Sequence, residues 1–170
     1  MLSHNLIHSI EDHCEEILRT VIEQLCQKKE LAHISKLPSS ELMDWGRSIL
    51  KNLGHWLTSR DETLGRDYEA LGKLRFEESV PLAECVLGLQ ALKHRMVDFV
   101  RGRGFARSSL EIYAEEELEH RVNRFFDDLT YHMVKGYEDA LRKAAHIEEK
   151  PPEQKPPPPA PWVNWEPQFM

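Results

Sequence analysis

Apolar residues recur three to four positions apart through almost the whole chain before residue 147. This spacing is that of one face of an α-helix, and no segment shows the alternation expected of a half-buried β-strand. The pattern therefore predicts an all-α fold, a bundle of about five helices over residues 1–149. A separate Pro-rich segment, disordered or extended, is predicted for residues 150–170.

Proline and serine mark the boundary between the first two predicted helices. The first is predicted over residues 3–29, and the second begins after Pro38, where Ser39 and Ser40 can cap it. The apolar stripe of the second helix continues to Leu57. We therefore expect one unbroken helix there.

A capping box, a proline and two glycines delimit the next two helices. Ser59 and Glu62 have capping-box spacing, which predicts the start of the third helix. Pro81 lacks an N–H and suits a first helical turn, so it opens the fourth. Gly102 and Gly104 can adopt the left-handed conformation that closes a helix, and we expect them to end it.

A second capping box, Ser108 with Glu111, opens the last helix, which is predicted to continue to about Ala145. Its apolar residues cover a wide arc: Leu118, Val122, Phe125, Phe126, Leu129, Met133, Val134, Tyr137, Ala140 and Leu141. Such a helix is either central to the fold or shared between two subunits. We predict a homodimer through it.

Net charge and cysteine usage narrow the class of protein. With 22 Lys and Arg against 29 Asp and Glu, the formal charge is −7, which disfavours nucleic acid as a partner. The three cysteines form no CxxC pair, which is typical of reduced thiols. No window has the length of apolar sequence that a membrane span needs. We therefore expect a cytoplasmic protein without a membrane partner.

Nine histidines raise the alternative of a metal or haem protein. Glu117 and His120 have the Glu-x-x-His spacing of di-iron bundles, but His120 points roughly 165° from the apolar stripe of its helix, which disfavours an inward site. His94 and His132 lie at the flanks of their stripes, where either could serve as a haem or metal ligand. No motif for a catalytic nucleophile or a phosphate-binding loop is present, so we expect no enzyme and no cofactor.

The Pro-rich segment contains eight of the ten prolines and ends with Trp162, Trp165 and Phe169. Four consecutive prolines favour a polyproline II extension. Two interpretations stay open: an appendage without a function, or a stiff aromatic peptide that docks a signalling partner at small entropic cost.

Lys93 is the one charged residue near the middle of the apolar stripe of its predicted helix. A lysine there extends its ammonium to the edge of the domain or pairs with a carboxylate. Glu77, Asp127 and Glu138 are the candidate partners.

Two segments resemble the N-terminal domain of RsbR-type stressosome proteins, the RsbRD N-terminal domain family. They are "GKLRFEESVPLAECVLGLQALKHRMVDFV" and "VNRFFDDLTYHMVKGYEDALRKA". The matching residues stand in the family's order: Arg75, Pro81, Leu82, Glu84, Leu92 and Lys93 in the first segment, and Phe125, Phe126, Asp127, Gly136, Tyr137 and Glu138 in the second.

The resemblance implies a globin-like helical fold that binds no haem, dimerises through its last helix and acts as a sensory or regulatory module. Family members commonly carry a STAS domain or a kinase after this domain, whereas here we expect a stand-alone domain with a Pro-rich tail. The candidate functional or interface residues are Lys93, Arg75, Phe126, Tyr137 and Glu138.

Overall fold

The computed structural model describes residues 2–59, 62–102 and 108–146, and within these ranges it contains helices and no β-strand. The all-α prediction is confirmed. The elements are α1 (Leu2–Asp12), α2 (Cys14–Gln27), the 3₁₀ turns η1 (Lys29–Leu31) and η2 (Ile34–Lys36), α3 (Ser39–Leu50), α4 (Leu53–Thr58), α5 (Thr63–Glu77), α6 (Leu82–Gly102) and α7 (Ser109–Ala144).

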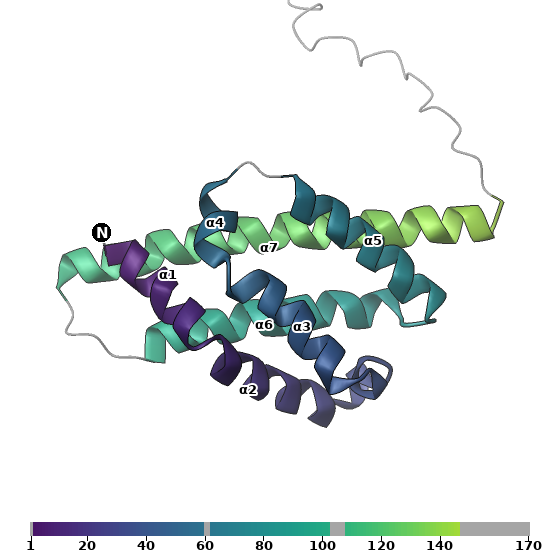
Figure 1. Cartoon of the computed structure of the whole chain (residues 1–170), viewed down its shortest axis with the longest axis horizontal. Helices are drawn as coiled ribbons and strands as arrows, with labels where there is room; N and C mark the ends of the chain where they lie inside the picture. The colour runs from purple at the N-terminus through teal and green to yellow at the C-terminus, as the bar shows by residue number, and fades with distance from the viewer. Residues whose placement is uncertain (1, 60–61, 103–107, 147–170) are drawn as a thin grey trace, which may run out of the picture.

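Helix α7 spans the molecule from end to end, and the other long helix, α6, runs beside it (Figure 1). Helices α1, α4, α5 and α6 all contact α7, while α2 contacts α3 and α6. The wide apolar arc of α7 is therefore explained by the central position of this helix, where Phe126 is fully buried. In the described ranges, no helix combines the length and apolarity that crossing a membrane requires.

Two of the predicted boundaries are confirmed. Helix α6 begins directly after Pro81, and α7 begins after Ser108, whose hydroxyl accepts from the backbone N–H of Glu111 at 3.3 Å. The Glu111 carboxylate in turn accepts from the Ser108 backbone N–H at 2.8 Å. This reciprocal pair satisfies two backbone donors that a helix start leaves free.

The prediction of one helix over residues 3–29 is wrong, because the chain breaks at His13. Its backbone has φ −101° and ψ 18°, outside the helical range. The ring Nδ1 lies 2.8 Å from the carbonyl oxygen of Ser9, which also accepts from the His13 backbone N–H at 3.2 Å. The side chain thus competes for a carbonyl that helical hydrogen bonding uses, and the axis changes direction between α1 and α2.

The second predicted helix is likewise divided, into α3 and α4, with Asn52 between them. The start of α4 is stabilised from a distant part of the sequence, since Glu11 of α1 accepts from the Gly54 backbone N–H at 2.9 Å. A carboxylate at a helix N-terminus satisfies a free donor and complements the helix dipole. Local sequence does not show this contact.

Two predicted N-terminal caps are also wrong. Pro38 stands at the N-cap of α3 without a side-chain bond, so neither Ser39 nor Ser40 caps that helix. Ser59 ends α4, where its backbone N–H donates to the His55 carbonyl, and α5 begins only after Glu62. Helix α6 ends at Gly102, where its end is predicted, although Gly102 itself is not left-handed. Gly104 and the Pro-rich segment lie outside the described residues.

Helices α5 and α7 approach so closely that their backbones touch at two glycines. A Cβ atom on Gly72 would lie 2.1 Å from the carbonyl oxygen of Met133, and one on Gly136 would lie 1.9 Å from that of Glu69. The contact is reciprocal, because each glycine faces the backbone of the other helix. Only residues without a side chain fit at this crossing.

Candidate functional site

Two charged side chains are buried in the described part of the chain. Arg75 of α5 is 5% exposed and Glu84 of α6 is 6% exposed. A buried charge destabilises a fold unless hydrogen bonds and an opposite charge compensate it. Both residues belong to the segment that resembles the RsbR-type domains, although only Arg75 was a candidate functional residue.

Arg75 is compensated by two carboxylates. Its guanidinium donates through NH2 to Glu41 of α3 at 2.6 Å, and through NH1 to Glu78. Burial alone lowers the pKa of Arg75, but the bonds to Glu41 and Glu78 outweigh burial and raise it. The cation is therefore permanent and its nearest partners tie α3 to the end of α5, which is a structural role.

Glu84 holds the two 3₁₀ turns against the start of α6. Its carboxylate accepts from the backbone N–H groups of His33 and Ile34 at 2.9 and 3.0 Å, and from His33 Nδ1 at 2.7 Å. Burial raises the pKa of Glu84, yet these hydrogen bonds outweigh burial and lower it below its usual range. We call this contact the Glu84 clamp.

A hollow of about 380 Å³, counted to its opening, lies beside Arg75. Its lining is otherwise apolar: Leu25, Ile34, Leu37, Leu42, Trp45, Leu71, Cys85, Gly88 and Met133. Burial raises the pKa of the Cys85 thiol to about 11, so this sulfur is a protonated, weak nucleophile at neutral pH. The hollow offers apolar contact, and its only charge is already paired.

Lys93 extends to the surface between α6 and α7. Its side chain is 13% exposed, and Nζ lies 3.8 Å from Oδ1 of Asp127, which is 70% exposed. The prediction of a carboxylate partner is confirmed for Asp127. The long distance and the exposed acid make this a weak ion pair, and any functional role of Lys93 stays a prediction.

The other candidate residues differ in their surroundings. Phe126 is fully buried and stacks edge-on against Phe125, which makes it a core residue. Tyr137 packs edge-on against Phe76 and donates to the Val80 carbonyl at 3.0 Å, so it fixes the turn between α5 and α6. Glu138 is exposed on α7. Together with Arg75 they do not form a single site.

The two histidines of the haem or metal alternative differ in environment. His94 is exposed on α6, whereas His132 of α7 lies with Nδ1 2.8 Å from the Glu69 carboxylate of α5. The opposite ring nitrogen of His132 faces Gly65, where an added Cβ would lie 2.8 Å from it. Across the described ranges no cluster of three metal-ligand side chains occurs. The alternative stays a prediction.

A broad surface groove, which we call the α4–α7 groove, lies between the end of α4, the start of α5 and the middle of α7. Its empty space is about 1750 Å³, counted to its open mouth. The lining is Trp56, Leu57, Ser59, Glu62, Leu64, Gly65, Arg66, Glu69, Arg121, Arg124, Phe125, Asp128, Leu129, His132 and Lys135. The sequence patterns did not indicate this feature, because its residues come from three separate segments.

Polar contacts hold the walls of the α4–α7 groove together. Arg121 donates to the Leu57 carbonyl at 3.1 Å, and the Glu69 carboxylate accepts from Lys135 Nζ at 2.7 Å as well as from His132. Bonds from Lys135 and then from His132 lower the pKa of Glu69. In the described part of the chain, the guanidinium groups of Arg66 and Arg124 form no ion pair, so both remain able to bind a ligand at the groove.

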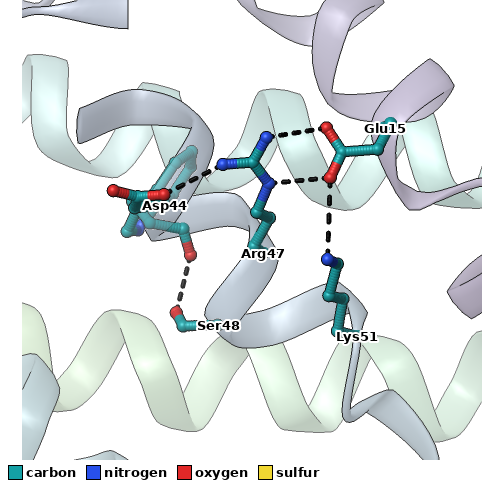
Figure 2. A network of polar contacts seen from close by, with 6 residues as sticks. Glu15, Asp44, Arg47, Ser48 and Lys51 are labelled. Carbon is teal, nitrogen blue, oxygen red and sulfur yellow. Dashed lines mark hydrogen bonds and ion pairs between the residues drawn. The ribbon is translucent and has the colours of Figure 1, made fainter. Parts of the chain in front are cut away.

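The densest charged network connects α2 and α3 at the surface (Figure 2). Arg47 binds both oxygens of Glu15, through Nε at 2.7 Å and NH2 at 2.9 Å, and also binds Asp44 at 2.9 Å. Lys51 approaches Glu15 at 3.8 Å. The guanidinium is occupied by these two acids, so we assign the network to fastening α2 on α3.

Comparisons with protein-family models, with curated proteins and with solved structures give no significant match. The resemblance to RsbR-type N-terminal domains, the globin-like arrangement and the stressosome connection therefore stay predictions.

Proposed function

We propose that the chain is a non-catalytic regulatory or sensory protein: a non-haem, globin-like helical module that pairs with a second copy through α7 and binds a signalling partner. The observation that carries this proposal is the outward face of α7. Tyr113 and Tyr131 are 68% and 62% exposed there. They stand 18 residues apart, which is five full helical turns, so they point in the same direction.

The composition of this face suits a protein interface. Exposed Leu141 adds apolar surface toward the C-terminal end of α7, and exposed His120 and Glu138 supply polar positions between the tyrosines and beyond them. Tyrosine is enriched in interfaces because its ring buries a large area while its hydroxyl keeps a polar contact. The opposite face of α7 is occupied by the core, so a second copy has this outward face available.

The position of α7 suggests how a signal would pass. It contacts α1, α4, α5 and α6, so a change in its packing against a second copy would reach most of the fold. A ligand or partner shifts such an equilibrium only if it binds one packing more tightly than the other. The partner would therefore contact α7 or a helix packed on it.

Measuring the molar mass by size-exclusion chromatography with light scattering tests this proposal. We expect the wild type to show twice the 19.9 kDa of one chain at micromolar concentration. Tyr131→Glu should yield the monomer, because it places a charge at the seam. Leu87→Glu is the matched control, since Leu87 is 44% exposed on α6 and away from α7's outward face. A monomeric wild type, or a Tyr131→Glu dimer, would refute pairing through this face.

A further inference from the structure

The α4–α7 groove has the chemistry of a site for an aromatic peptide. Trp56, Leu57 and Phe125 are half-buried in it and leave apolar surface exposed. Arg66 and Arg124 are exposed on its lining, and neither guanidinium forms an ion pair with another described residue. Arginine binds the face of a tryptophan ring through a cation–π contact, so both kinds of lining favour an aromatic ligand.

The α4–α7 groove is an open surface feature and not an enclosed cavity. Its empty space of about 1750 Å³ includes the solvent at its mouth. An extended segment of several residues can therefore lie along it with more than one aromatic side chain.

The chain carries such a segment beyond α7. Residues 156–170 read "PPPPAPWVNWEPQFM" and contain Trp162, Trp165 and Phe169. This segment has one acid, Glu166, and no base, whereas the groove has four basic residues, Arg66, Arg121, Arg124 and Lys135, against three acids. The charge of the segment is therefore compatible with the groove.

The segment is also long enough to reach the groove from the end of α7. The helix rises 1.5 Å per residue, so Arg121 lies about 35 Å before Ala144 and His132 about 18 Å before it. Residues 147–161 span up to about 46 Å at the polyproline II rise of 3.1 Å per residue. His146 has φ 52°, a left-handed conformation of the kind that commonly follows the end of a helix.

We propose that the aromatic segment 162–169 binds the α4–α7 groove of its own chain. Such a contact would bring the tryptophan rings to a lining that includes Trp56 and Phe125 together with Arg66 and Arg124. A protein partner that recognises the same aromatic segment would have to displace it from the groove. The segment would thus act as an internal competitor, whether or not the chain forms a dimer.

The indole N–H signals in a ¹H–¹⁵N NMR spectrum of the full chain test this proposal. The chain has four tryptophans, and a synthetic peptide of residues 156–170 supplies the unbound reference positions for Trp162 and Trp165. In the wild type, we expect both signals to be displaced from those positions. The displacement should not change on dilution, because the contact is within one chain.

Two exposed arginines provide the variant and its matched control. Arg124→Glu, on the groove, should return the Trp162 and Trp165 signals toward the reference positions, while Arg142→Glu, on α7 but away from the groove, should leave them displaced. Both side chains are exposed, so neither change affects the core. Wild-type signals at the reference positions, or signals that Arg124→Glu does not move, would overturn the proposal. A displacement that disappears on dilution would assign the groove to another copy and also overturn it.

Discussion

Replacing Gly136 with alanine should separate α5 from α7. The new methyl group would lie 1.9 Å from the Glu69 carbonyl oxygen, whereas a close carbon–oxygen contact between helices is about 3.3 Å. The helices would have to move apart by about 1.4 Å. Gly72→Ala meets the Met133 carbonyl at 2.1 Å and requires nearly the same displacement. In both cases the obstacle is backbone, which cannot rotate away as a side chain does.

The expected cost follows from two opposing effects. Overfilling a well-packed interior costs about 1–3 kcal/mol and occasionally more. Alanine in place of glycine favours a helix by about 1 kcal/mol. Because the clash is with backbone and the displacement exceeds an ångström, we expect each substitution to lower the free energy of unfolding by about 2 kcal/mol or more. In a domain of this size, that corresponds to a fall in Tm of roughly 4–8 °C.

Gly88→Ala is the matched control, because Gly88 is also a buried glycine inside a helix. A Cβ there would contact only Ile34 Cδ1, at an ordinary 3.4 Å. This variant should gain up to about 1 kcal/mol from helix propensity. Guanidinium unfolding followed by circular dichroism compares the three variants. If Gly136→Ala were as stable as Gly88→Ala, the backbone contact between α5 and α7 would be refuted.

Two further predictions concern charged groups. The pKa of Glu84 is lower in the folded chain, so its contribution to stability is complete above about pH 4.5 and is lost as the pH falls through the lowered pKa. Glu84→Gln should lower the free energy of unfolding by about 1–3 kcal/mol at neutral pH and should weaken the loss of stability below about pH 4.5. If stability fell with acid as steeply in Glu84→Gln as in the wild type, the Glu84 clamp would be contradicted. Lys93→Met should leave the free energy of unfolding unchanged or raise it, because the ion pair with Asp127 is weak. If urea unfolding showed a free energy of unfolding lower by more than about 1 kcal/mol, the ion pair would stabilise the fold and the prediction would be wrong.

The parts of the fold that could be predicted from sequence are those that local patterns determine. The Ser108–Glu111 capping box and the position of Pro81 act within one helical turn, and both predicted boundaries are confirmed. The break between α3 and α4 depends on Glu11, which is 43 residues from its partner Gly54. Such a contact exists only after the chain has folded, so no local pattern indicates it.

The same distinction applies to the candidate site. Periodicity placed Lys93 in the apolar stripe of its helix and left pairing with a carboxylate as one alternative, with Asp127 among three possible partners. The pair with Asp127 is present. Arg75 was singled out by resemblance alone, and its burial between Glu41 and Glu78 depends on the packing of α3 against α5. The α4–α7 groove escaped prediction because its lining comes from three separate segments, which lie side by side only in the folded chain.

The Glu84 clamp also governs when two backbone amides can exchange hydrogen with solvent. The N–H groups of His33 and Ile34 have a carboxylate from α6, 51 and 50 residues away, as their acceptor. Their exchange therefore requires the Glu84 carboxylate at the start of α6 to move away from them, and not only fraying of the neighbouring helices α2 and α3. Two amides in the connection between α2 and α3 thus report on a distant helix start, and their exchange rates would measure the local stability of the α5–α6 joint.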